Sequence, residues 1–211
     1  MTELQNILYK TAVVPVIKIS DPAKSVPLAH ALVKGGILTA EITFRTEAAA
    51  EAIRRMLDAE PGMVVGAGTV LTLRALDDAV SAGSAFIVAP GLNPKIVREA
   101  QCRKVPMVPG IMTPTEIEAA LDLGLDFVKF FPAEAAGGSK MLKAVSAPYS
   151  MVRFMPTGGI TMENVGEYLS LKYVICCGGS FIADDKLIES GDFEQITRNA
   201  AAVCELAAKY R

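Results

Sequence analysis

The sequence predicts an α/β protein that folds as one (β/α)8 TIM barrel over residues 1–211. Eight short apolar runs alternate with amphipathic stretches of helical period, which is the pattern of parallel strands covered by helices. The chain has 211 residues, 51% of them hydrophobic, which suffices for one well-filled core. The main rival is a doubly wound open sheet, which would need a glycine-rich turn after its first strand. Residues 15–20 contain no glycine, so the barrel is favoured.

The predicted strands are short runs rich in Val, Ile and Phe, bounded by glycine, proline or polar residues. In chain order they are Ala12–Ile17, Ile37–Phe44, Met63–Gly66, Phe86–Val88, Pro106–Val108, Phe127–Phe130, Val152–Met155 and Val174–Cys177.

The predicted helices lie between these strands, and several carry sequence signals at their ends. Thr113-Pro114 and Asn93-Pro94 place a capping residue before an N-terminal proline. Glycines at 35, 83 and 124 follow helical stretches, where a left-handed C-terminal cap is expected. The helices are Ala23–Lys34, Glu47–Ala59, Thr72–Ala82, Pro94–Cys102, Thr115–Leu123, Lys140–Ser146, Met162–Leu169 and Phe193–Lys209, with a short extra helix over Thr2–Tyr9.

Composition excludes several classes of function. The net charge is -2 and no basic run occurs, so neither nucleic acid nor a membrane surface is an expected partner. No apolar stretch reaches the ~20 residues of a spanning helix. His30 is the only histidine, which argues against a zinc site or a serine triad. The four cysteines show no CxxC spacing, so they are expected to be reduced, mostly buried and cytoplasmic.

The second strand carries a candidate polar face. Glu41, Thr43 and Arg45 share one parity, so an extended chain points all three to the same side. An acid and a guanidinium at a barrel mouth would supply a proton-transfer group and a carboxylate clamp. The alternative, an ion pair on a helix surface, conflicts with the strand-like Ile42-Thr43-Phe44.

Lys129 is the candidate nucleophile. It lies between Val128 and Phe130 near the end of the sixth predicted strand, where a barrel places its catalytic groups. Lysines in buried sites generally have a lowered pKa, and a neutral amine attacks carbonyls to form Schiff bases. The alternative is a lysine that extends to solvent or pairs with a carboxylate. Lys18, at the end of the first strand, is a competing amine with more polar neighbours.

Glycine-rich turns follow the third, seventh and eighth strands. Gly66-Ala67-Gly68-Thr69 would let a ligand approach the backbone, with the Thr69 hydroxyl beside it. Gly158-Gly159 and Gly178-Gly179-Ser180 end the last two strands, the usual phosphate site of a barrel. The substrate is therefore expected to be phosphorylated.

With these residues placed, the chain resembles the KHG/KDPG aldolase family over nearly its whole length. The segments that carry the resemblance are Val14–Ile17, Leu32–Gly36, Glu41–Glu47, Val65–Val70, Lys129–Glu134, Pro156–Ile160 and Gly178–Ser180.

The resemblance implies a role for each matched residue. Lys129 would be the Schiff-base lysine and Glu41 the general acid and base, with no metal or cofactor required. Arg45 would hold the carboxylate of the keto acid, Thr69 would bind pyruvate, and Phe131 would form a wall of the pocket. The implied phosphate end comprises Thr157, Gly158, Gly159, Gly179 and Ser180.

The resemblance also implies a reaction and an assembly. A 2-keto-3-deoxy-6-phosphogluconate aldolase yields pyruvate and D-glyceraldehyde 3-phosphate in the Entner–Doudoroff pathway, and members often also cleave 4-hydroxy-2-oxoglutarate. The implied assembly is a cytoplasmic homotrimer. Three alternatives stay open: the galactonate-series aldolase of the same family, a phosphosugar isomerase or epimerase, and a non-catalytic barrel that binds sugar phosphates. Because a lysine, Lys18, stands at the end of the first strand, the resemblance leaves open whether the substrate belongs to the gluconate or the galactonate series.

Overall fold

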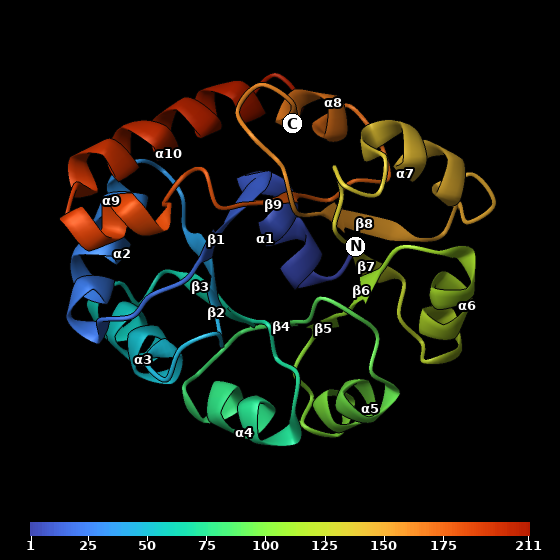
Figure 1. Ribbon diagram of the computed structural model, residues 1–211, viewed down its shortest axis with the longest axis horizontal. Coiled ribbons are helices and arrows are strands. Elements are labelled where there is room, and N and C mark those ends of the chain that lie inside the picture. Colours follow the sequence, from blue (N-terminus) through green and yellow to red (C-terminus); the bar gives the residue numbers. More distant parts are fainter.

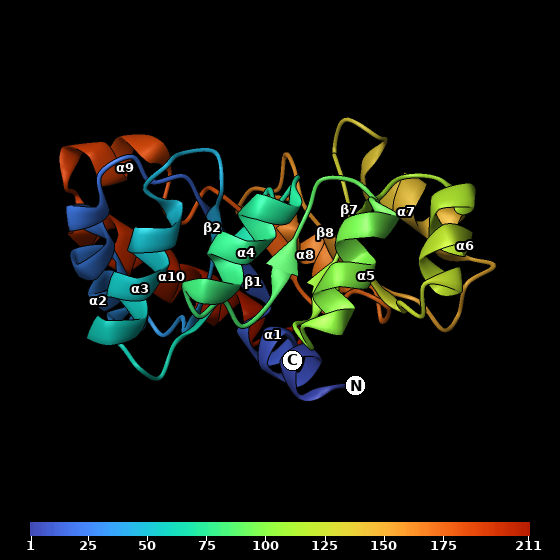
Figure 2. The same ribbon diagram turned by 90° about the horizontal axis from the view of Figure 1, so that it is seen from below.

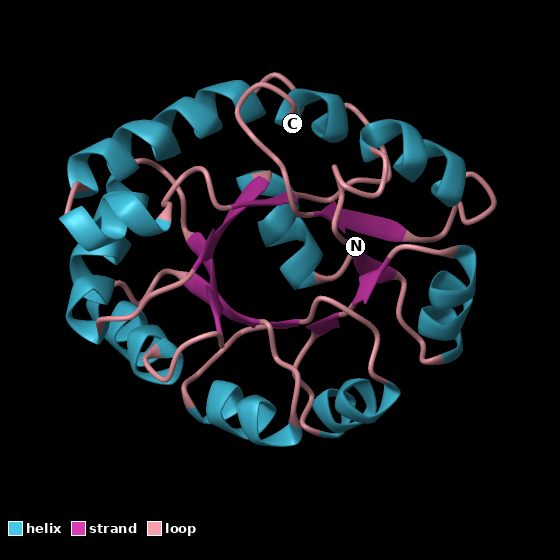
Figure 3. Cartoon of the chain, in the orientation of Figure 1, coloured by secondary structure: helices cyan, strands magenta, loops and turns pink.

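The computed structural model describes residues 1–211 as a ring of parallel strands surrounded by helices (Figures 1 and 3). Six strands pair in the order β5-β4-β3-β2-β1-β9, and three pair in the order β6-β7-β8. The strands are β1 Val13–Ile17, β2 Thr39–Thr43, β3 Val64–Gly68, β4 Ile87–Val88, β5 Met107–Val108, β6 Gly110–Ile111, β7 Phe127–Phe130, β8 Arg153–Pro156 and β9 Cys177–Gly179.

The two sheets are parts of one closed barrel. β5 and β6 are the two halves of a single barrel strand that is interrupted at Pro109; β5 pairs with β4, and β6 pairs with β7. Proline has no N–H for a ladder hydrogen bond, which accounts for the break. On the opposite side, bridges Phe154–Val174 and Thr157–Gly178 join the β8 side to the β9 side. The barrel therefore has eight strand positions, as the sequence predicts.

The helices cover the outside of the barrel. Of the three glycines expected as left-handed C-terminal caps, Gly83 and Gly124 have positive φ angles, but the expectation for Gly35 is wrong: its φ angle is -82°, and the left-handed residue is Gly36. The two predicted N-terminal caps are confirmed. Thr113 and Asn93 both accept hydrogen bonds from the first turns of their helices. The helices are α1 Glu3–Thr11, α2 Ser25–Lys34, α3 Ala49–Ala59, α4 Leu73–Ser81, α5 Pro94–Cys102, α6 Pro114–Asp122, α7 Gly138–Ser146, α8 Val165–Leu169, α9 Asp185–Ser190 and α10 Phe193–Ala207, with a 3-10 turn η1 at Pro22–Lys24.

Besides the added half-strand β6, the structure differs from the sequence prediction at three elements. The expected helix over 23–34 is divided into η1 and α2, because Pro22 begins a separate turn capped by Asp21. α9 was not predicted. The eighth strand lies three residues later than expected, at β9 rather than over 174–177, because Gly178 and Gly179 pair with Val14 and Pro15 of β1.

The amino-terminal end of the barrel is closed by α1, which lies beneath the ring with both chain termini near it (Figure 2). Leu8 of α1 is fully buried and joins the nine-residue cluster that fills the barrel interior. The other members are Val14, Phe86, Val88, Val108, Phe127, Met155, Ile175 and Cys176. With this end filled by apolar side chains, a ligand can enter the barrel only from the carboxyl ends of the strands.

We expect Leu8→Ala to lower the free energy of unfolding by about 2–5 kcal/mol, because it removes a fully buried side chain and leaves a cavity. Urea denaturation followed by circular dichroism measures the change. Asn6→Ala on the exposed side of the same helix is the control, with an expected change within about 0.5 kcal/mol. Equal stability of the two variants would show that α1 does not seal the barrel.

The cysteines are all unpaired, and burial separates them into two kinds. Cys176 and Cys177 are fully buried, and desolvation raises the pKa of the Cys177 thiol to about 12. Cys204 is half-buried, and Cys102 is exposed, so the expectation of mostly buried cysteines is correct for only two of the four. No helix is both long enough and apolar enough to cross a membrane.

Candidate active site

Lys129 and Glu41 meet inside the carboxyl-terminal half of the barrel. Lys129 lies on β7, and Glu41 lies on β2. The Lys129 Nζ atom is 3.5 Å from Glu41 Oε1, and the two side chains are 6% and 1% exposed. Glu41 therefore pairs with Lys129 and not with Arg45. Of the two alternatives for Lys129, extension to solvent is wrong, and pairing with a carboxylate is confirmed.

The environment of Glu41 is costly for a structural carboxylate. Both of its oxygens are buried and neither has a hydrogen-bond partner in the protein. Buried carboxylates in folded proteins are normally satisfied by several hydrogen bonds, and exceptions concentrate at functional sites. The free lone pairs point to a carboxylate that is kept available for proton transfer near the Lys129 amine.

Gly68 makes room for Glu41. It ends β3 on the strand next to β2. A Cβ atom at this position would lie 2.1 Å from Glu41 Oε1 and 2.7 Å from its Cγ. Any side chain at residue 68 would thus displace the Glu41 carboxylate from its present position beside Lys129.

We expect Gly68→Ala to reduce turnover by roughly 10²-fold, because a displacement of about 1 Å at a catalytic group costs that much. The measurement is pyruvate release, the activity that the resemblance implies, in a coupled lactate dehydrogenase assay. Gly62→Ala is the matched control, since a Cβ atom there meets nothing within 4 Å. A Gly68→Ala protein with normal turnover would mean that the position of Glu41 is not critical.

Phe131 connects the lysine to the glycine turn after β8. Its ring centroid is 5.2 Å from Lys129 Nζ. A Cβ atom at Gly158 would lie 3.2 Å from the same ring. The Phe131 ring thus lies close to both the Lys129 amine and the turn that was predicted to bind phosphate.

The turns after β8 and β9 present free backbone donors. The N–H groups of Gly158, Gly159 and Ser180 donate to no backbone or side-chain oxygen of the chain. Gly158 and Gly159 have φ angles of +98° and +78°, which favour glycine. Thr157 is buried beside them and bridges to Gly178, so the two turns lie next to each other. Adjacent free amides of this kind bind anions.

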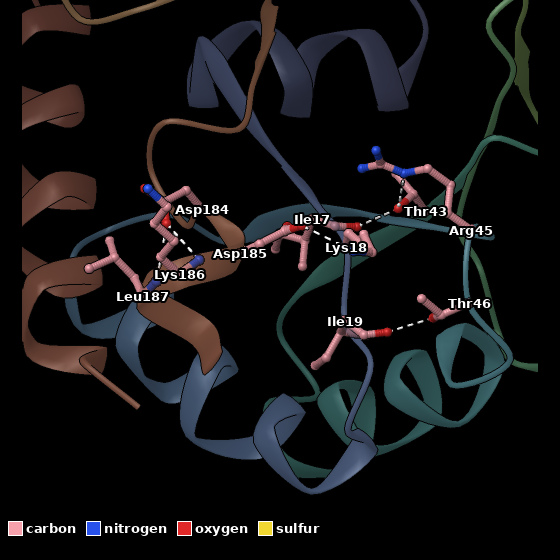
Figure 4. A network of polar contacts seen from close by, with 10 residues as sticks. All are labelled: Ile17, Lys18, Ile19, Thr43, Arg45, Thr46, Asp184, Asp185, Lys186 and Leu187. Atoms are coloured by element: carbon pink, nitrogen blue, oxygen red, sulfur yellow. Dashed lines mark hydrogen bonds and ion pairs between the residues drawn. The ribbon is translucent and has the colours of Figure 1, made fainter. Parts of the chain in front are cut away.

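In the short helix α9, two of the first N–H groups are already bonded. Its capping residue Asp184 already accepts hydrogen bonds from the N–H groups of Lys186 and Leu187 (Figure 4). The two glycine turns, with Ser180 at the end of β9, remain the candidate anion site.

Arg45 follows β2 and is exposed at the barrel mouth. Its Nε donates to Thr43 Oγ1 at 3.1 Å, and Thr43 Oγ1 donates to the Ile17 carbonyl at 2.8 Å (Figure 4). Arg45 and Ser180 line one open cavity of about 390 Å³, together with Asp184, Asp185 and Lys186. Arg45 therefore lies at the same cavity as the carboxyl-terminal end of β9. The hydrogen bond by which Thr43 holds the Arg45 side chain was not predicted.

Thr69 follows Gly68 directly and has a φ angle of +58°. A β-branched residue in this left-handed region is strained, and such strain is concentrated at functional sites. Its position at the end of β3, half-buried, is where the sequence predicts a ligand-binding hydroxyl.

A hydrogen bond braces the loop that follows β7. The Tyr168 hydroxyl donates to the Glu134 carboxylate, and burial, reinforced by Glu134, raises the pKa of Tyr168. The Glu134 N–H donates to the Gly158 carbonyl at 3.0 Å. Glu134 therefore ties the loop after Lys129 to the glycine turn. Its buried partner on α8 is too far away in the sequence for any local pattern to indicate it.

The titratable side chains form no cluster of three His, Cys, Asp or Glu residues that could hold a metal ion.

Comparisons with known proteins agree with this geometry. The profile of the family described as KDPG and KHG aldolase matches residues 4–199. A 2-dehydro-3-deoxy-phosphogluconate aldolase from Haemophilus influenzae is 45% identical over 199 residues, which cover 94% of each chain. The KHG/KDPG aldolase of Escherichia coli is 44% identical over 97% of this chain and 96% of the relative.

Comparison with solved structures also finds aldolases of this kind. A KDPG aldolase from Legionella pneumophila, with pyruvate captured as a covalent carbinolamine intermediate, superposes with a TM-score of 0.91 at 39% identity, covering 96% of this chain and 98% of that one. The alpha subunit of tryptophan synthase from the same genus has a TM-score of 0.74 at 14% identity, which shows only the shared barrel fold. The matches extend over nearly the whole chain and include the strands that carry Lys129 and Glu41, so the chain belongs to the KDPG and KHG aldolase family.

Proposed function

We propose that this chain is a class I aldolase that reversibly cleaves 2-dehydro-3-deoxy-6-phosphogluconate to pyruvate and D-glyceraldehyde 3-phosphate. The observation that carries the proposal is the buried pair of Lys129 and Glu41, in which the carboxylate has no other partner. The relatives named 2-dehydro-3-deoxy-phosphogluconate aldolase support the choice of substrate.

The first half of the reaction forms a Schiff base. Glu41 accepts the proton that the Lys129 ammonium must lose, since the two groups are 3.5 Å apart. The neutral amine attacks C2 of the keto acid and gives a carbinolamine. Glu41 then returns the proton to the C2 hydroxyl, water leaves, and an iminium ion remains.

The second half breaks the carbon–carbon bond. Glu41 removes the proton of the C4 hydroxyl, directly or through one water molecule. The C3–C4 bond electrons move into the iminium and leave an enamine, while C4 departs as the aldehyde. Protonation of the enamine at C3 and hydrolysis of the imine release pyruvate and restore Lys129.

The remaining site residues are proposed to hold the two ends of the substrate. Arg45 and Thr69 would bind the pyruvyl end, and Phe131 would limit access of water to the imine. The phosphate would lie on the free amides of Gly158, Gly159 and Ser180, with Thr157 and Gly179 supporting the two turns.

Borohydride trapping tests this proposal directly. Incubation with pyruvate and borohydride should reduce the imine and leave one pyruvyl adduct on the peptide that contains Lys129. An adduct on another lysine, such as Lys18, would identify that lysine as the nucleophile in place of Lys129. Insensitivity to borohydride would favour an isomerase or epimerase instead.

The range of substrates is the second question. The Escherichia coli relative is named KHG/KDPG aldolase, so we propose that this chain also cleaves 4-hydroxy-2-oxoglutarate to pyruvate and glyoxylate. The galactonate-series substrate is the alternative, because its aldolase has the same barrel. Pyruvate release from the gluconate-derived, galactonate-derived and unphosphorylated substrates ranks these activities.

We further propose a single-domain, cytoplasmic homotrimer in the Entner–Doudoroff pathway. Leu71 and Met112 follow β3 and β6 and are 55% and 39% exposed, which offers apolar surface to a partner subunit. Light scattering on the purified protein measures the mass and tests the trimer.

A further inference from the structure

A second cavity opens at the other end of the barrel, next to the start of β8. Its volume is about 470 Å³. It is lined by residues from the last turn of α7, the following loop, the first residue of β8 and the loop after α8. In Figure 1 this region lies at the right-hand edge, where the chain passes from α7 to β8. The glycine turns of the proposed active site lie at the opposite end of β8.

The cavity is lined by three cations and no carboxylate. Lys143, Arg153 and Lys172 all contribute to its wall, and none of them forms an ion pair. The Arg153 guanidinium is held only by the carbonyls of Ser150 and Val152. Three unpaired cations around one hollow give a concentrated positive potential in a chain whose net charge is -2.

Helix stabilisation does not account for this cluster. Lys143 lies in the last turn of α7, where a cation is favoured by the helix dipole. Arg153 and Lys172 come from other elements and have no such role. The positive charge therefore belongs to the cavity rather than to one helix end.

The same wall contains two fixed aromatic rings. Tyr149 donates its hydroxyl to Glu118 at 2.9 Å. Tyr173 packs edge-on against Phe154, with ring centroids 5.9 Å apart. Both rings line the cavity, so a ligand would meet a rigid apolar surface beside the cations.

We propose that this cavity is a binding site for a small, multiply charged anion, separate from the active site. The ligand chemistry is a phosphate ester, a diphosphate or a polycarboxylate that meets Lys143, Arg153 and Lys172 together. A guanidinium with two ammonium groups favours anions with several charged oxygens over chloride or acetate.

Tyrosine-labelled protein allows a direct test by NMR, because the chain has five tyrosines and no tryptophan. Tyr149 and Tyr173 report on the cavity, while Tyr168, bonded to Glu134 near the glycine turns, reports on the proposed active site. Pyrophosphate, citrate and ADP are titrated separately at constant ionic strength. We expect at least one of them to shift the Tyr149 and Tyr173 resonances to saturation.

Two double variants test whether the anion binds in this cavity. Lys143→Gln with Lys172→Gln should weaken that binding at least about ten-fold and leave aldolase turnover unchanged. Lys95→Gln with Lys209→Gln removes the same charge from exposed positions elsewhere and should change neither. Tighter binding of ADP than of pyrophosphate would assign a role to the rings, and tighter binding of citrate would identify a polycarboxylate site.

Two results would overturn the proposal. One is saturable shifts at Tyr168 alone, which would place all anion binding at the active site. The other is equal anion affinity in the two double variants, which would show that the anion responds to the overall charge of the protein and not to this cavity.

Discussion

Replacing Lys129 by methionine is expected to abolish borohydride trapping with pyruvate and to reduce aldol cleavage by roughly 10⁴-fold or more. Removal of a catalytic nucleophile has an effect of this order, because the remaining groups cannot form the covalent intermediate. Methionine has about the volume of lysine and leaves the packing against Phe131 largely intact. Mass spectrometry of the trapped protein and the coupled pyruvate assay measure the two losses.

The same substitution is expected to affect stability. It removes the only charged partner of Glu41, which is 1% exposed and has no hydrogen bond. Breaking a buried pair by removing one member costs about 3–5 kcal/mol. Lys129→Met with Glu41→Met removes both charges and should recover much of this loss.

The double variant keeps the test interpretable. If Lys129→Met unfolds, the double variant provides a folded protein that lacks the amine, and it should still fail to trap pyruvate. A folded Lys129→Met protein that cleaves the substrate at a normal rate would remove Lys129 from the mechanism.

The barrel could be predicted because its signals are local. Each strand is a short apolar run, and each helix has its own caps, so the alternation of elements is visible without any tertiary information. The interruption at Pro109 could not be predicted as a change of sheet, because it depends on β4 and β7 pairing with different halves of one strand. The register of β9 likewise depends on its pairing with β1.

The candidate site was predicted only in part for the same reason. Parity on β2 placed Glu41 on the inner face, and the apolar flanks of Lys129 indicated burial. No sequence pattern indicates that these residues, 88 positions apart by their numbers, come within 3.5 Å of each other. Gly68 is similar, since its need to be glycine arises from the Glu41 side chain of the neighbouring strand. The resemblance to a known family implied that Lys129 and Glu41 act in one reaction, and the structure supplies their geometry and the role of Gly68.

Replacing Glu41 by glutamine is expected to separate imine formation from proton transfer. Glutamine keeps the shape of the side chain but cannot accept and return a proton. General acid–base catalysis contributes about 10²–10⁴-fold, so cleavage should fall by this factor while trapping with pyruvate persists at a reduced rate. Glu47→Gln removes the same charge from an exposed position just after Arg45 and should leave the rate unchanged.

Exchange of the pyruvate methyl protons in D₂O isolates the step that requires Glu41. The imine must lose a C3 proton to become the enamine, and no aldehyde or phosphate takes part. If Glu41 moves this proton, exchange should fall by the same factor as cleavage, because one group serves both steps. If cleavage is lost but proton exchange stays normal, Glu41 acts only on the C4 hydroxyl. If the rates of cleavage and exchange are both normal, another group is the base. The two free oxygens of Glu41 favour the first result, since a carboxylate without hydrogen bonds can turn toward either carbon as the reaction proceeds.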